Sequence, residues 1–325
     1  MKLVMIRGRW LLAVLALCAT ALQAQTYPSK PIRVVVPFPA GGTTDIAARL
    51  VAQKMSDAMG QPFLVENRGG AGGTIGADAV AKSAPDGYTL LMHNITFPLA
   101  SVSLGLSGRL PYNADTDFAG VSIVVNVPLV ITANPAIAPR DLRELATLLQ
   151  KNPSLKYSFG STGPGSFMHV IGEAFKKSAK VEMVHIPFKG AAPLKQELLA
   201  GRLEVGGDQL SSSLAEIKAG KLRALATNAS KRIADLPDVP TVRELGFPDL
   251  EAEGWNGFFV AAKTPREIIE RLQKETVAAL GNADLRKRLA EIGAEPVGST
   301  PAEQEAIFRK QMAQFRPVIQ TLKLD

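Results

Sequence analysis

Residues 34–50 read VVVPFPAGGTTDIAARL, which passes from a strand through a loop into a helix. The β-branched run at the start predicts a buried strand, and the prolines and glycines after it end that strand. Thr43 or Thr44 is expected to cap the helix that follows, with Asp45 in its first turn. Such a loop brings a helix N-terminus to the carboxyl end of a strand, where unpaired N–H groups form an anion site.

The side chains of this loop are small and none of them is basic. Alanine and glycine at 40–42 let a ligand approach the main chain closely. The absence of lysine and arginine from residues 36–48 favours a small carboxylate over a triphosphate as the ligand. The residues that we expect to contact it here are Phe38, Ala40, Gly41, Gly42, Thr43 and Asp45.

The length and composition indicate an exported protein with two lobes. The chain has 325 residues, of which 46% are hydrophobic and 21% are charged, and this suits two globular lobes. Residues 1–24 have the pattern of a signal peptide, with basic residues before the apolar run 10–17 and small residues before a cleavage site between Ala21 and Gln25. We therefore expect the mature chain to lie in the periplasm.

The charge and the cysteine usage narrow the function further. Part of the formal net charge of +7 belongs to the signal peptide, and the remaining excess is spread along the chain, which gives no basis for nucleic-acid binding. The single cysteine, Cys18, is removed with the signal peptide, so no disulfide is expected. We expect a monomer that is free in the periplasm.

Strands and helices alternate along the chain in two series, which predicts two α/β lobes with mixed, mostly parallel sheets flanked by helices. In the first series strands are expected at 34–36, 62–66 and 88–92, with helices from 43 to about 60 and from 74 to 84. Residues 93–120 look irregular. Strands are then expected at 121–125, 129–133, 156–159, 181–186, 203–206, 222–227 and 258–262. Helices are expected around 142–149 and at 167–178, 191–200, 214–219, 265–280, 283–292 and 301–322.

The last three helices come with only one strand, so they are expected to return to the first lobe. This predicts one lobe from residues 25–125 with 228–325 and another from residues 126–227. The chain would cross twice, near 125–127 and near 227–228, and these crossings are candidate hinges. The architecture is a clamshell that closes on a ligand between the carboxyl ends of two sheets.

A second loop, SFGSTGPGS at 158–166, repeats the pattern of the first loop in the other lobe. If both loops face one cleft, two helix N-termini point at the ligand from opposite sides. The alternative is that these residues only cap helices and turn the chain. The candidate ligand-binding residues here are Ser158, Gly160, Ser161, Thr162 and Gly163.

Three further places are candidates, each with a structural alternative. Lys189 and Gly190 precede a third helix start, although Lys189 is equally typical of a solvated turn. His169 lies one turn into a helix and either contacts the ligand or packs in the core. Asp208 follows a short strand and either meets an amine on the ligand or caps a helix.

Motifs for catalysis, metals and nucleotides are missing from the sequence. The run GAGGTI at 70–75 has isoleucine where the last glycine of a dinucleotide motif belongs. The three histidines lack zinc-site spacing, and no G-x-S-x-G elbow occurs. We therefore expect no cofactor, no metal and no catalytic residue. An exported hydrolase is the competing hypothesis, and it would need an activated nucleophile that the sequence does not offer.

The sequence resembles the substrate-binding receptors of tripartite tricarboxylate transporters, the Bug receptors, over nearly all of the mature chain. The matching motifs are YPSKPI (27–32), VPFPAGGTTD (36–45), VENR (65–68), PDGYTLL (85–91), HIPFKG (185–190), IKAGKLRALA (217–226) and LPDVPT (236–241). The resemblance implies a type II periplasmic-binding fold and no enzymatic activity. It also implies that the loops at 38–45 and 158–166 hold carboxylates, partly through waters.

The sequence departs from the family pattern near the expected pocket. His93 and Asn94 stand where small residues are usual, and we include both among the ligand-binding candidates. Phe188 replaces a usual tyrosine, and glycines precede Asp208. The expected function is delivery of a small carboxylate to a membrane transporter, through transient contact with its subunits. A sensory co-receptor for the same ligand is the alternative.

Overall fold

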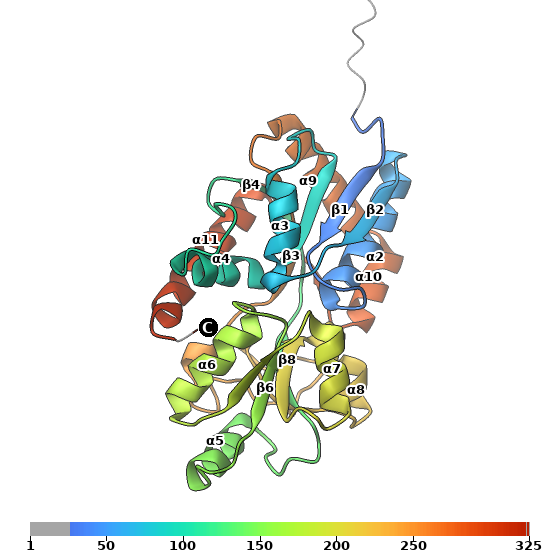
Figure 1. The fold of residues 1–325 in the computed structure, drawn as a ribbon. Helices are drawn as coiled ribbons and strands as arrows, with labels where there is room; N and C mark the ends of the chain where they lie inside the picture. Colours follow the sequence, from blue (N-terminus) through green and yellow to red (C-terminus); the bar gives the residue numbers. More distant parts are fainter. Residues whose placement is uncertain (1–26, 323, 325) are drawn as a thin grey trace, which may run out of the picture.

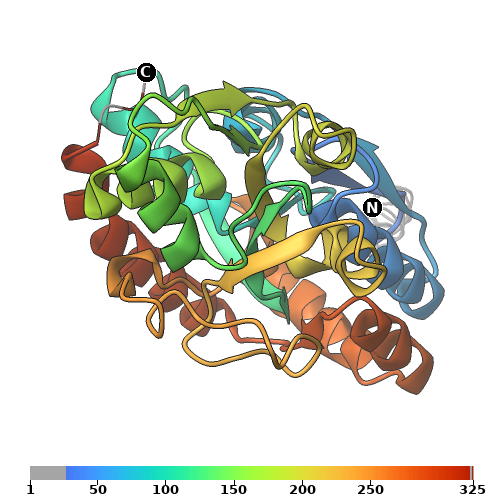
Figure 2. The ribbon, with the colours of Figure 1, turned by 90° about the horizontal axis from the view of Figure 1, so that it is seen from below.

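The computed structural model describes residues 27–322 and 324, so the predicted signal peptide lies outside the described residues. Two α/β lobes lie one above the other, each built on its own sheet (Figure 1). Seen from below, the C-terminal helices run along one side of the molecule (Figure 2). None of the described helices combines the length and apolar character that a membrane crossing requires. The predicted two-lobed fold with two mixed sheets is confirmed.

The sheet of the first lobe has the order β11-β4-β10-β3-β1-β2. Its strands are β1 (Ile32–Val36), β2 (Phe63–Asn67), β3 (Thr89–Asn94), β4 (Phe118–Asn126), β10 (Trp255–Ala261) and β11 (Glu295–Pro296). β1 pairs in parallel with β2 and β3, whereas β10 lies antiparallel between β3 and β4. The centre of the first sheet is thus completed by a strand from the C-terminal third of the chain.

Six α-helices flank this sheet. They are α2 (Thr43–Met59), α3 (Thr74–Ala81), α4 (Thr96–Leu106), α9 (Arg266–Leu280), α10 (Ala283–Glu291) and α11 (Pro301–Gln320). The terminal helices return to this lobe, since α9 packs on α2 and α11 packs on α4. Their ends follow from local sequence: α2 stops at Gly60 in the left-handed conformation, and Thr300 with Glu303 forms a capping box before α11.

The second lobe has a sheet of order β7-β6-β8-β5-β9. Its strands are β5 (Leu129–Ala133), β6 (Ser158–Ser161), β7 (Val184–Pro187), β8 (Val205–Gln209) and β9 (Arg223–Thr227). Its helices are α5 (Leu142–Lys151), α6 (Phe167–Ala179), α7 (Ala191–Leu199) and α8 (Leu214–Lys218). Only β5 runs against the other strands of this sheet, so the carboxyl ends of β6, β7 and β8 meet at one edge. That edge faces the first lobe.

The prediction of irregular structure over residues 93–120 is wrong, because α4 occupies Thr96–Leu106. Every residue from Thr96 to Leu104 is buried, so the helix has no polar face and no amphipathic period. Its Phe97 ring is fully buried and contacts five other aromatic rings. Those rings are His93, Tyr112, Phe118, Phe259 and Phe308. Because α4 is buried on all sides, its sequence lacks the alternation of apolar and polar residues from which a helix is predicted.

Two stretches of chain connect the lobes near the base of the cleft. The first joins β4 to β5, and there the Val127 N–H donates to the Gly254 carbonyl oxygen at 2.9 Å. The second joins β9 to β10. Its first part stays against the second lobe, since Val242 N–H donates to the Thr227 carbonyl oxygen and Ala252 N–H donates to the Asn228 carbonyl oxygen, and the chain then enters β10. The predicted lobe boundaries at 126 and 228 stay a prediction.

Candidate functional site

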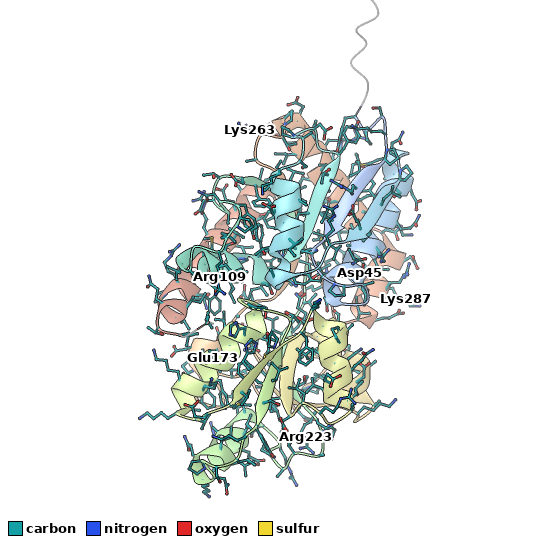
Figure 3. All side chains as sticks on the ribbon, viewed as in Figure 1. Asp45, Arg109, Glu173, Arg223, Lys263 and Lys287 are labelled. Carbon is teal, nitrogen blue, oxygen red and sulfur yellow. The ribbon has the colours of Figure 1, made fainter. Side chains whose placement is uncertain are left out.

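Residues from both predicted loops line one small cavity between the lobes. From the first lobe come Phe38, Pro39, Gly42, Thr43, Thr44 and Asn94, and from the second come Thr162, Ala191 and Asp208. The cavity volume is about 10 Å³, which is close to the space that one water molecule needs. In Figure 3 Asp45, at the start of α2, lies where the lobes meet, whereas Lys263 lies at the far end of its lobe. The two loops therefore share one cleft.

A larger chamber of about 290 Å³ adjoins this inner cavity. Both spaces are lined by Phe38, Pro39 and Thr162. The remaining lining residues of the chamber are Pro37, Gly70, Ala71, Gly72, Gly73, Gly163, Pro164, Pro187, Phe188 and Lys189. The lining is apolar apart from backbone groups, Thr162 and Lys189. The cleft thus consists of a narrow polar inner cavity and a wider, mostly apolar space, which we call the outer chamber.

Two glycines allow the lobes to approach each other closely. A Cβ atom added to Gly72 would lie 2.3 Å from the carbonyl oxygen of Pro164 in the other lobe. A Cβ atom added to Gly190 would lie 2.5 Å from Cδ of Pro39. Because such distances are too short for any real Cβ, only glycine permits this approach.

The predicted side-chain cap of α2 by Thr43 or Thr44 is wrong. Gly42 is the N-cap residue, and no side chain bonds to the first turn as a cap. The Thr43 hydroxyl is buried without a hydrogen-bond partner and belongs to the cavity wall. The unpaired N–H groups of the first turn and this hydroxyl are therefore available to a ligand.

The second helix N-terminus at the cavity belongs to α7, which corrects the expectation that it would be the helix after residue 166. A Cβ atom on Gly42 would lie 3.9 Å from the Cβ of Ala191, the first residue of α7. The start of α6 is engaged elsewhere, since Phe167 N–H lies 3.5 Å from Thr96 Oγ1 and Gly165 N–H donates to His169 Nδ1. Two helix N-termini oppose each other across the cavity, and their dipoles both favour an anion there.

Asp45 holds the shape of the first loop. Its Oδ2 atom accepts from the Gly41 N–H, and its Oδ1 atom accepts from Arg49 Nε and Asn67 Nδ2, each at 2.9 Å. Asn67 Nδ2 also donates to the carbonyl oxygen of Phe38. Burial alone would raise the pKa of Asp45, but these hydrogen bonds and the charge of Arg49 outweigh it and lower the pKa. The carboxylate therefore acts on the loop that carries Phe38 and Gly42.

Replacing Asp45 with asparagine is expected to destabilise the fold by about 1–3 kcal/mol at pH 7, because bonds to a charged acceptor are lost. The lowered folded-state pKa means that the contribution of Asp45 is present above about pH 4 and is lost as the pH falls through that folded pKa. Urea unfolding should therefore show a smaller difference between variant and wild type at pH 3 than at pH 7. Asp57→Asn, at an exposed position on the same helix, is the control and should change little. An equal difference at both pH values would contradict this role.

Asn94 and Thr44 begin a chain of buried hydrogen bonds that crosses between the lobes. Asn94 Nδ2 donates to Thr44 Oγ1 at 3.0 Å, and Thr44 Oγ1 donates to Asn256 Oδ1 at 2.8 Å. Asn256 Nδ2 then donates to Gln209 Oε1 of the second lobe at 3.1 Å. All four side chains are buried. The wall of the inner cavity is thereby bonded to the connection between the lobes.

His93 supports the cavity from behind. Its ring stacks on Phe97 at 4.7 Å and meets Phe38 edge-on at 5.3 Å. Burial lowers its pKa to about 3, so the ring is neutral at pH 7. Its Nδ1 atom accepts from the Asn94 N–H, which places the ring hydrogen on Nε2, toward Gly73. His93 thus packs against both Phe38 and the glycine-rich turn at residues 70–73 and supports their positions.

Comparison with known proteins identifies the family. The family model described as "Tripartite tricarboxylate transporter family receptor" matches residues 47–324. The chain belongs to this family. Protein BugT of Bordetella pertussis is 37% identical over 301 residues, covering 93% of this chain and 92% of BugT. The family is one of solute-binding receptors and not of enzymes.

Solved structures agree with this family. The periplasmic binding protein BugD is 33% identical, with a TM-score of 0.85, over 92% of this chain and 99% of BugD. MatC of Rhodopseudomonas palustris, solved with bound malate, is also 33% identical, with a TM-score of 0.84, over 90% of this chain and all of MatC.

Several predicted site residues of the receptor lie outside the cleft. Ser158 sits at the opposite end of β6 and bonds to Glu204, which corrects its predicted position. Gly160 is buried inside its lobe against Leu203. Ala40 and Gly41 are exposed on the outer side of their loop and do not line either space. Ser161 braces its own loop through His185 Nε2 and Gly163, so Thr162 is the residue of that loop that reaches the inner cavity.

His169 belongs to a different cavity of the receptor, which corrects its predicted position. That cavity, of about 620 Å³, lies between α6 and the end of α11 and is also lined by His185, Glu173, Lys176 and Leu322. The two imidazole rings stack at 3.9 Å, and burial lowers the pKa of His169 to about 3 and that of His185 to about 4. Both rings are therefore neutral at pH 7 and brace the loop at 161–166 from below.

Sequence reasoning missed part of the receptor's cleft. The glycine-rich turn at 70–73 was set aside as a failed nucleotide motif, yet it forms one wall of the outer chamber. A usable signal was its place directly after β2, because parallel neighbours of β1 end at the same edge. Asp208, Asn94, Thr162 and Lys189 were predicted and do line the cleft. No group of three or more metal-ligating side chains occurs in residues 27–322.

Proposed function

We propose that this chain is a periplasmic receptor that closes its two lobes on a small carboxylate and delivers it to a tripartite tricarboxylate-type transporter. The ligand class includes di- and tricarboxylates and acidic amino acids. The receptor is exported by cleavage of residues 1–24, acts as a monomer and contacts the transporter subunits transiently. Its lobes comprise residues 25–125 with 228–325, and residues 126–227.

The opposed N-termini of α2 and α7 are the observation that carries this proposal. Their unpaired N–H groups, together with the Thr43 hydroxyl, supply donors for a carboxylate in a cavity where N–H to carboxylate contacts are strengthened by the exclusion of water. The outer chamber adds Lys189 and an apolar wall for the rest of the ligand. Binding of malate by MatC supports an acid of this size. We therefore assign the ligand contacts to Phe38, Gly42, Thr43, Asn94, Thr162, Lys189 and Asp208.

Closure follows from where these groups lie. The donors of α2 are in one lobe and those of α7 are in the other, so only the closed arrangement brings both to one ligand. A ligand that favours the closed form shifts the population of the two arrangements toward it. The closed receptor then presents one continuous surface to its transporter.

A thermal-shift screen of the chain without residues 1–24 tests the proposal. The panel contains malate, succinate, citrate, glutamate, acetate and neutral amides. At a ligand concentration of about 100 times Kd the folded state gains about 2.7 kcal/mol, which raises the Tm by several degrees. We expect such a shift for at least one di- or tricarboxylate or acidic amino acid and none for the neutral amides. A shift from the amides alone, or turnover of any compound during the assay, would overturn the proposal.

A further inference from the structure

Asp208 is a carboxyl group in a cavity that is otherwise built for an anion. It occupies the next-to-last position of β8, opposite Val130, and lines the inner cavity together with Gly42 and Thr43. No ion pair involves Asp208 among residues 27–322, and the named influences on its pKa are burial and the neutral residues Gln209 and Ser212. The carboxyl group therefore has no cation to balance it.

The charged groups around Asp208 are engaged elsewhere. On the elements that surround the cavity, Asp45 pairs with Arg49, Lys176 pairs with Glu173, and Lys195 pairs with Glu216. The remaining titratable groups on these elements lie away from the cavity or are neutral. They are Lys54 and Asp57 on α2, of which Lys54 pairs with Asp284, Lys177 on α6, Glu197 on α7, Glu204 before β8, Lys189 before α7, and the neutral imidazoles His93 and His169. β5 and β6, which flank β8, carry no charged residue. Only Lys189 lines the cleft, in the outer chamber.

A ligand carboxylate bound at the N-termini of α2 and α7 would lie beside Asp208, because Gly42, Ala191 and Asp208 line the same inner cavity. Two carboxylates that share one small site cannot both stay ionised, because like charges in a cavity of low polarity repel strongly. A single proton between them converts this repulsion into a short O–H···O⁻ hydrogen bond. Binding of a ligand carboxylate in this cavity therefore favours the protonated form of Asp208.

We propose that the receptor takes up one proton from solvent when an acid binds, and that Asp208 holds this proton and donates it to the ligand carboxylate. This rests on the proposed function, because it needs an acid in the cleft. The free Asp208 carboxylate, one proton and the ligand carboxylate become a carboxyl group hydrogen-bonded to a carboxylate. No covalent bond is formed or broken apart from the O–H bond.

The titration of the free protein sets the pH range of the effect. Burial raises the pKa of Asp208 to about 7, although hydrogen bonds from the Gln209 N–H and from Ser212 act in the opposite direction. Free receptor at pH 9 is therefore ionised at Asp208, and binding must bring the proton in. With a pKa of about 7, the affinity for an acid is expected to fall about fiftyfold between pH 7 and pH 9.

Calorimetry measures the proton directly in the unmodified receptor. Malate, succinate, citrate and glutamate are each titrated at pH 9 in two buffers of different ionisation enthalpy, so that the difference in heat counts the protons taken up. We expect about one proton per bound acid at pH 9 and about half a proton at pH 7. Asp208→Asn, which mimics the protonated carboxyl, should bind with no proton uptake and with little change in affinity between the two pH values. Asp57→Asn is the matched control and should keep the wild-type uptake.

The outcomes separate this inference from the proposed function. If no acid of the panel binds at either pH, the proposed function is wrong, and the inference falls with it. If an acid binds to wild-type receptor without proton uptake at pH 9, the proposed function stands and only the role of Asp208 is overturned. The same holds if glutamate binds without uptake and Asp208→Asn abolishes its binding, because Asp208 would then pair with the ammonium group.

Discussion

Replacing Gly72 with alanine is expected to weaken ligand binding about 100-fold while leaving each lobe folded. The Cβ atom would lie 2.3 Å from the Pro164 carbonyl oxygen across the cleft, and both partners are backbone, so neither can rotate away. The lobes must separate to relieve this contact. If this contact makes the closed arrangement less favourable by about 2.7 kcal/mol, the population of the closed form falls about 100-fold. The apparent Kd for the ligand then rises about 100-fold.

Gly60→Ala is the matched control for this variant. Gly60 has φ +67° against +63° at Gly72, and nothing lies within 4 Å of the position of its Cβ. Both variants should therefore lose about 1 kcal/mol of stability through left-handed backbone strain. Only Gly72→Ala should lose affinity in calorimetric titration. Equal affinities for the two variants would show that the lobes do not need the contact seen here.

Replacing Asn256 with alanine is expected to destabilise the protein by about 3–5 kcal/mol. The change removes the partner of the Thr44 hydroxyl and of the Gln209 amide at a place where no water reaches, since Asn256 has no exposed surface. Two buried polar groups are then left without their bonds, and a cavity is added. Urea unfolding monitored by circular dichroism measures the loss.

Two further variants separate the effect of the bond between the lobes from the general effect of replacing an asparagine. Asn256→Asp keeps an acceptor for Thr44 and removes only the donor to Gln209, so it tests the bond between the lobes. It should be destabilised as well, because its charge is buried without a partner. Asn152→Ala, at an exposed asparagine beyond the end of α5, should change the free energy of unfolding by less than about 1 kcal/mol. A loss at Asn256 no larger than that at Asn152 would contradict the importance of the buried chain.

The sequence predicted those elements whose signal is local. The β-branched run before Pro37 and the glycine at 60 mark the ends of β1 and α2, and the structure confirms both. α4 was missed because burial on all sides leaves no hydrophobic period to read. The predicted cap of α2 was wrong because Gly42 is the N-cap residue, so Thr43 and Thr44 both lie in the first turn. Thr44 bonds there to Asn256, and the Thr43 hydroxyl has no partner.

The candidate site was predictable where a loop follows a strand and not where the cleft depends on contacts between distant segments. Thr162 follows β6 and Asp208 is the next-to-last residue of β8, and both strands end at the cleft, so the positions of these residues could be inferred from topology. Gln209 and Asn256 meet only because β8 and β10 come together at the connection of the lobes, and no local pattern reports this. The choice of α7 over α6 likewise depends on how the second sheet faces the first.

The position of β10 has a consequence for how the chain is made and exported. β3 and β4 have no direct pairing with each other, since β10, at residues 255–261, lies between them. A nascent or partly translocated chain that ends before residue 255 therefore presents two unsatisfied strand edges, which are sites for aggregation. The N-terminal lobe must wait for most of the polypeptide to arrive, while the strands and helices of the other lobe are already complete by residue 227.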